Sequence, residues 1–289
     1  ILLNLHIRKM KIKSIQDLEN IPKYITRLEF DNDFNTPIEK YPDWITHIRF
    51  GINFNQRVDN LPNSVTNLYF STESNFNYSI DNCPNSLTHL SLGKYFNQLV
   101  DNLPLNLIYL SFNGYFNKPV DNLPNKLKCL KISWVFNQPI NCLPNSITHL
   151  YLFGDFNQPI NHLPTQLTHL HLNENFNQPI NHLPTQLTHL YLDANFNQYL
   201  DNLPNSITNI SFTKCDACFN LPINNLPTQL THLILAKNFN HLIELLPTQL
   251  THLFLGTYFV QHVDLLPNNL LNLEFSNLSN FNLPVDNLP

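Results

Sequence analysis

Apolar and polar residues alternate over short stretches that recur along the whole chain. One of them is LTHLHLNEN, residues 167–175, in which Leu170 and Leu172 fall on one side of an extended backbone. His169 and His171 fall on the other side, because successive side chains of a strand point to opposite faces. This period of two predicts a short strand with an apolar inner face and a polar outer face.

Each predicted strand belongs to a unit that repeats about every twenty residues. The sequence FNQPINHLPTQLTHL occurs at residues 156–170 and again, without a change, at residues 176–190. A proline follows the phenylalanine of each copy by eight residues, and these phenylalanines are at positions 34, 54, 76, 96, 116, 136, 156, 176, 196, 219, 239, 259 and 281. We therefore predict one array over residues 1–289, with about thirteen repeats of 20–22 residues. We expect residues 1–13 to be its degenerate start, residues 211–219 to hold an insertion, and the chain to be a fragment of a longer protein.

Stacking such units places parallel strands about 4.8 Å apart, with columns of Leu, Ile and Phe as a continuous core. The return path carries prolines at fixed places, which excludes a regular helix and favours extended or polyproline-like backbone. Phe176 and its equivalents should plug the interior. The asparagine after each phenylalanine is expected to turn inward and to bond backbone groups of adjacent coils. This structural ladder includes Asn137, Asn157, Asn177 and Asn197.

The pattern LxxLxLxxN followed by phenylalanine resembles the leucine-rich repeat. Its form here, F-N-x-P-[IVL]-x-x-L-P-x-x-L-T-H-L, is similar to the FNIP-repeat family over roughly residues 14–289. That family is known mainly from social amoebae and from giant DNA viruses of amoebae, often with an N-terminal F-box. The resemblance implies a mainly β, right-handed solenoid with a concave parallel sheet, a non-helical convex side and a role in binding proteins. A role as a ubiquitin-ligase adaptor, with a Skp1-type partner, is implied only if an F-box lies upstream.

If the scaffold is constant, recognition falls to the outward strand positions that vary between repeats. Aromatic side chains provide contact area there at low entropic cost. The alternative is that these side chains only stack on one another along the sheet. The candidates for binding a partner on the concave face are Tyr109, His149, Tyr151, Phe153, His169, His171, His189 and Tyr191.

Two columns of ionisable residues suggest other chemistry. The histidine column is a poor zinc site, because zinc requires about four ligands in tetrahedral arrangement, whereas a pH effect is a reasonable hypothesis. Asp59, Asp81, Asp101 and Asp121 form an acidic column. We favour capping of turn amides by these carboxylates over a cation site, because Asn replaces Asp later in the column. No metal or other cofactor is predicted.

Composition narrows the remaining classes. The net charge is −5, and no basic stripe follows the coils, which disfavours nucleic-acid binding. No stretch approaches the ~20 apolar residues of a membrane span. Five cysteines without a secretory signal favour reduced thiols in the cytoplasm, which is the host cytoplasm for a viral protein. The single CxxC, Cys215 to Cys218, is interpreted as an insertion loop rather than as a zinc or redox site.

Catalytic motifs such as a Gly-rich phosphate loop, G-x-S-x-G or H-E-x-x-H are absent, so we predict that the protein is not an enzyme. The leading hypothesis is a protein–protein interaction module that binds a partner of unknown identity on its concave sheet. The alternative is a structural solenoid that associates end to end through uncapped strand edges.

Overall fold

The computed structural model describes residues 8–212, 217–286 and 288, and this part of the chain contains fourteen strands. It divides into two compact units, residues 1–138 with 142–147, and residues 139–141 with 148–289. The first unit contains β1 (Lys9–Ile12), β2 (Arg27–Phe30), β3 (His47–Phe50), β4 (Asn67–Phe70), β5 (His89–Leu92), β6 (Tyr109–Phe112) and β7 (Cys129–Ile132). The second contains β8 (His149–Leu152), β9 (His169–Leu172), β10 (His189–Leu192), β11 (Asn209–Phe212), β12 (His232–Ile234), β13 (His252–Leu255) and β14 (Asn272–Phe275).

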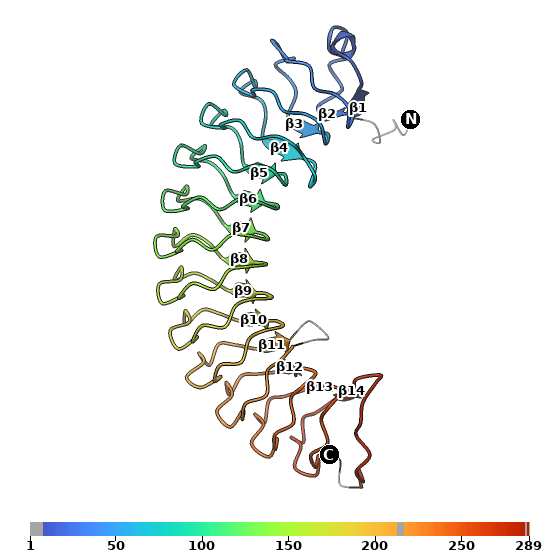
Figure 1. Cartoon of the computed structure of the whole chain (residues 1–289), viewed down its shortest axis with the longest axis vertical. Helices are drawn as coiled ribbons and strands as arrows, with labels where there is room; N and C mark the ends of the chain where they lie inside the picture. Colours follow the sequence, from blue (N-terminus) through green and yellow to red (C-terminus); the bar gives the residue numbers. More distant parts are fainter. Residues whose placement is uncertain (1–7, 213–216, 287, 289) are drawn as a thin grey trace, which may run out of the picture. The chain divides into compact units, whose positions relative to one another are not determined.

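Within each unit, every strand pairs in parallel with the next strand of the sequence (Figure 1). The register is that of the repeat, so that His169 lies opposite His189 and Leu170 lies opposite Leu190. Strands line one side of the coils, and turns and extended segments form the return path. The predicted leucine-rich-repeat-like solenoid is therefore confirmed.

The core consists of columns of identical or similar side chains. Leu170, Leu172 and Phe176 are at most 1% exposed, as the alternation predicts. Within each unit, the phenylalanine rings of consecutive coils stack with centroids 6.1–6.4 Å apart. Each coil therefore buries its apolar groups against its neighbours and has no closed core of its own.

The proline column marks the turn that leads into each strand. The carbonyl of Pro164 accepts the N–H of Leu167 at 3.1 Å, and that of Pro184 accepts the N–H of Leu187 at 3.0 Å. Proline suits this place because it has no N–H of its own to satisfy. The return path is non-helical, as predicted; among the described residues the one helix is the 3₁₀ turn η1 (Ile15–Leu18).

The N-terminal segment differs from the prediction, and the structure does not test the interpretation of the CxxC motif. The segment expected to be a degenerate start contains β1, which pairs in register with β2, Lys9 opposite Arg27. Met10 and Ile12 provide the alternation that made this strand possible. The CxxC interpretation rests partly on Cys215, which lies outside the described residues.

Candidate functional site

The predicted binding residues of β8 to β10 form two parallel stacks on the outward face. The rings of His149, His169 and His189 are stacked, with the centroids of neighbouring rings 4.3 and 4.2 Å apart. Their planes are nearly parallel, with interplanar angles of 11° and 10°. Beside them, His171 lies 4.5 Å from Tyr151 and 3.8 Å from Tyr191. We call these six rings the ring stack. Both interpretations, a surface that binds a partner and rings that only pack on one another, are compatible with this stacking.

The other two predicted residues lie apart from this arrangement. Phe153 stands 6.1 Å from Tyr151, at the edge of the ring stack. Tyr109 belongs to the first unit, where its ring is 6.0 Å from that of His89. Burial raises the pKa of the Tyr109 hydroxyl, which therefore stays protonated at neutral pH.

Hydrogen bonds to threonine favour one tautomer of the outward histidines. The hydroxyl of Thr168 donates its single proton to the carbonyl oxygen of Thr148 at 3.0 Å. The hydroxyl oxygen of Thr168 also lies 2.9 Å from His169 Nδ1, and both contacts form together when the ring donates its Nδ1–H to that hydroxyl oxygen. The lone pair is then on Nε2, at the far end of the ring. The arrangement recurs at His189, His232 and His252.

Three of these histidines, His169, His189 and His232, are held neutral at pH 7. Desolvation, followed by the neighbouring His189 and His149, lowers the pKa of His169 to about 4. Desolvation is also the leading cause of the lowered pKa of His189 and of His232. These three histidines are therefore neutral at pH 7, and in the tautomer described above each offers Nε2 as a hydrogen-bond acceptor.

The stacked geometry does not suit a metal. Parallel rings aim their Nε2 lone pairs side by side, whereas a tetrahedral ion requires ligands that converge on one point. Within the described ranges, no group of three or more His, Cys, Asp or Glu side chains is placed to hold an ion.

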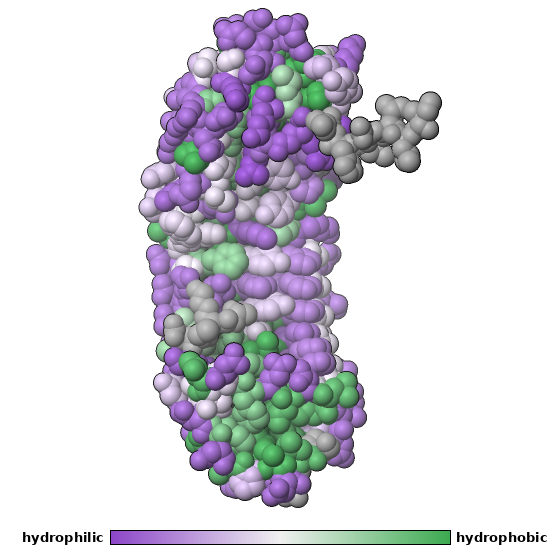
Figure 2. Space-filling model, turned by 90° about the vertical axis from the view of Figure 1, so that its right-hand side faces the viewer, coloured by the Kyte–Doolittle hydropathy of each residue, from purple (hydrophilic) through white to green (hydrophobic). Residues whose placement is uncertain are grey.

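A hollow of about 300 Å³ lies on the outward face over β10 to β14, and the sequence analysis did not single it out. Apolar side chains gather over the C-terminal strands in Figure 2, which views the molecule from the right-hand side of Figure 1. We call this feature the apolar hollow. It is lined by Tyr191, Asn209, Ile210, Ser211, His232, Leu233, Ile234, His252, Leu253, Phe254, Asn272 and Glu274.

A second hollow of about 410 Å³ adjoins the first and shares Ser211, Ile234 and Phe254 with it. Ile234 is 40% exposed although it is aliphatic. The sequence signal was present, because Ile234 and Phe254 occupy the same outward position in consecutive repeats, where other repeats carry Glu, Arg, Ser, Lys, His or Tyr.

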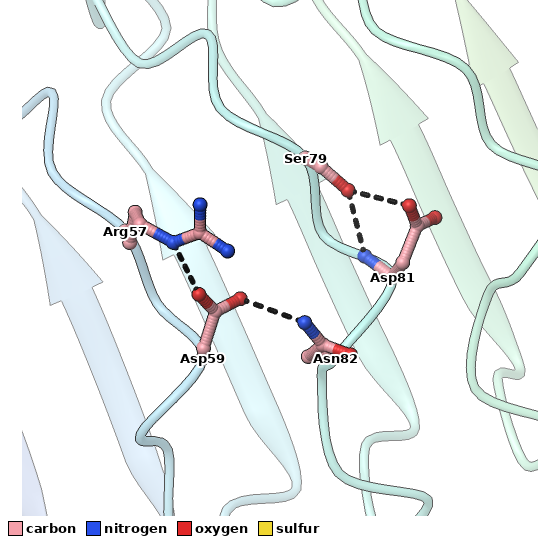
Figure 3. A network of polar contacts seen from close by, with 5 residues as sticks. All are labelled: Arg57, Asp59, Ser79, Asp81 and Asn82. Carbon is pink, nitrogen blue, oxygen red and sulfur yellow. Dashed lines mark hydrogen bonds and ion pairs between the residues drawn. The ribbon is translucent and has the colours of Figure 1, made fainter.

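The acidic column is bonded to side chains, not to the turn amides that we expected (Figure 3). Asp59 forms an ion pair with Arg57 and accepts a hydrogen bond of 3.2 Å from the amide of Asn82 in the next coil. Asp81 accepts from the hydroxyl of Ser79 at 2.7 Å. Asp59 therefore links two coils, whereas Asp81 is bonded within its own coil, and both roles are structural.

The asparagine ladder runs along the surface and is not buried. The N–H of Asn177 donates to Asn157 Oδ1 at 2.9 Å, and the N–H of Asn197 donates to Asn177 Oδ1 at 3.0 Å. The amide of Gln198 adds a second bond of 3.0 Å to Asn177 Oδ1. In the first unit, Asn137 donates in the same way to the preceding coil. The side chains are exposed or half-exposed, so the expected inward orientation is wrong.

The fold and the repeat place the chain in the class of leucine-rich-repeat-like solenoids. The FNIP Repeat family model matches residues 42–73, 57–95, 116–155, 136–173, 156–183, 176–215 and 219–258. These segments cover more than half of the sequence, so the chain belongs to the FNIP-repeat family. No curated protein sequence matches the chain.

Solved structures agree with this assignment. The chain is 37% identical to CroV588, described as a novel circular LRR protein, with a TM-score of 0.77 over 96% of this chain. It spans 50% of the length of that protein. The functional domain of InlJ from Listeria monocytogenes gives a TM-score of 0.62 at 16% identity, covering 88% of this chain and 59% of that domain. Toll in the Drosophila Toll–Spatzle complex gives 0.57 at 14% identity, covering 94% and 43%. These last two likenesses show the fold alone.

Other features of the described residues add no chemistry to this face. The buried thiol of Cys83 has its pKa raised to about 12, mainly by desolvation, so it is not a nucleophile at neutral pH. No helix in the part of the chain that the structure describes is long and apolar enough to cross a bilayer.

Proposed function

We propose that the protein is a protein–protein interaction module that holds its partner on the outward face of its sheet. The observation that carries this proposal is the apolar hollow, which is lined by the exposed Ile234 and the half-buried Phe254 on a face where most strands present polar groups. Exposed apolar patches with polar rims are typical of interaction sites. Leucine-rich-repeat-like solenoids commonly serve protein binding, which supports the same conclusion.

The ring stack extends this surface. Tyr191 stacks on His171 and also lines the apolar hollow, so the two features are continuous. In our proposal the hollow anchors apolar groups of the partner, and the ring stack offers aromatic edges and Nε2 acceptors beside it. Tyr109, in the other unit, remains a separate candidate contact.

Selection of displayed random peptides against the folded protein tests the proposal. The selected peptides should bind the parent and fail to bind a variant with Ile234→Ser and Phe254→Ser. The matched control carries Leu245→Ser and Leu265→Ser, which remove apolar surface of the return path that is 66% and 64% exposed. Peptides that ignore the first variant would contradict the proposal. No selected peptide, together with concentration-dependent mass, would favour the structural, self-associating alternative.

A second variant tests the ring stack by itself. Tyr151→Ser and His171→Ser, neither of which lines the apolar hollow, should together weaken binding of the selected peptides if the stack contributes, and should leave their affinity unchanged if its rings only pack on one another.

A role in ubiquitination and a Skp1-type partner rest on the family resemblance alone. They apply only to a longer chain that carries an F-box, and pull-down of Skp1 by the full-length protein tests them. A cytoplasmic location is likewise part of the proposal, and imaging of the tagged full-length protein tests it.

A further inference from the structure

We propose that the apolar hollow receives an arginine side chain from an extended segment of the partner protein. This inference rests on the proposed function, and it specifies the chemistry of the group that enters the hollow. Three features of the lining carry it: an apolar floor, a rim of hydrogen-bond acceptors and a single carboxylate.

The floor fits a long apolar stem. Ile234 and Phe254 lie on neighbouring strands, in register, and both line the hollow. The three methylene groups of arginine can lie along such a floor while the charged head stays at the rim. The ring of Phe254 also offers a π-face to a guanidinium, an interaction worth more where water is partly excluded.

The rim presents acceptors. Thr231 and Thr251 each donate their hydroxyl proton to a backbone carbonyl, at 3.1 and 3.0 Å. With those protons on the carbonyl oxygens, His232 and His252 donate through Nδ1 and keep the lone pair on Nε2. Their rings are 4.3 Å apart and inclined by only 6°, so two acceptors lie side by side. A ligand that meets this rim must supply donors.

The charge of the lining favours a cation. Glu274 is the one charged residue among the described residues that line the hollow. Asn272 donates to its Oε1 at 2.6 Å, which orients the carboxylate and leaves Oε2 available to a ligand. The net charge of −5 adds attraction for a basic partner at longer range.

Arginine satisfies these features better than the alternatives. Its guanidinium has five donors in a fixed fork, is weakly hydrated and stacks on aromatic rings. Lysine would supply a charge but a compact, strongly hydrated head. A purely apolar side chain would use the floor and leave the acceptors and the carboxylate unpaired, at a cost in affinity.

The test uses acetylated Gly-Ser-Leu-X-Leu-Ser-Gly peptides in which X is arginine, lysine, citrulline or norleucine, titrated into the whole chain by calorimetry. Citrulline has the shape of arginine without its charge. We expect arginine to bind about 10-fold more tightly than citrulline, and lysine to fall between them. Glu274→Gln should reduce the affinity of the arginine peptide to that of the citrulline peptide and leave the affinity of the citrulline peptide unchanged. The matched control is Glu29→Gln, at the same outward position of β2, which should change neither.

Each contrary result has a distinct meaning. Equal or tighter binding of norleucine, or an arginine preference that survives Glu274→Gln, overturns the inference while the protein-binding role stands. Failure of all four peptides to bind below about 1 mM, a free energy of about −4 kcal/mol, also overturns it. If selected peptides then still require Ile234 and Phe254, the proposed function survives.

Discussion

The asparagine ladder permits a quantitative test of how neighbouring coils stabilise one another. Replacing Asn177 by alanine removes the acceptor of two hydrogen bonds, from the N–H of Asn197 and from the amide of Gln198, both at 3.0 Å. The bond that the N–H of Asn177 itself donates to Asn157 is retained, because the backbone is unchanged.

The expected loss follows from these two bonds. A hydrogen bond contributes about 0.5–1.5 kcal/mol net, and exposed donors regain water when the acceptor is lost. Asn177→Ala should therefore lower the free energy of unfolding by about 1–2 kcal/mol. Asn177→Asp keeps the accepting oxygen and should stay within about 0.5 kcal/mol of the parent.

Urea unfolding followed by circular dichroism measures the free energy, and hydrogen exchange of the Asn197 amide reports the same bond locally. Gln186→Ala, an exposed change in the same coil outside the ladder, serves as the control. The reasoning would be refuted if Asn177→Ala matched this control, or if Asn177→Asp were as damaging as alanine.

Three further predictions follow from the core, the histidines and a crowded glycine. Phe176→Ala, at a site 1% exposed, should cost about 3–5 kcal/mol in chemical denaturation. Because the pKa of His169 falls to about 4 in the fold but lies near 6.5 when unfolded, the unfolded chain binds more protons. Stability should therefore be constant above pH 6.5 and decline as the pH falls towards 4, and His169→Asn should flatten this decline in thermal melts. Gly51→Ala would bring a Cβ into a clash with the carbonyl oxygen of Asp31 and should destabilise the fold by about 1–3 kcal/mol in urea; an unchanged midpoint would contradict that contact.

The strands were predictable because the repeat averages out local ambiguity. The inward positions of Leu170 and Leu172 follow from alternation, and the copies before and after repeat the same pattern. Proline columns excluded helices from the return path for the same reason. A single copy such as β1, with Met10 and Ile12 among basic residues, lacks this support and was not identified.

The candidate binding surface was less predictable than the fold. It depends on the burial of side chains and on their hydrogen bonds, which the amino-acid sequence does not show directly. Alternation places Ile234 and Phe254 outward, but it does not say that they border a hollow. Asn177 was expected to be buried, since a repeated polar residue must find partners, yet its carbonyl meets the next backbone at the surface. The tautomer of His252 depends on the hydroxyl proton of Thr251, which is donated to the carbonyl oxygen of Thr231 in the preceding coil.

The most direct test of the account is the location of a bound, selected peptide. In a protein with labelled isoleucine methyl groups, NMR titration should shift the methyl resonance of Ile234 in the apolar hollow. The methyl of Ile243, buried on the return path, should stay in place. Shifts at Ile243 with none at Ile234 would contradict the claim that the outward face of the sheet is the binding surface.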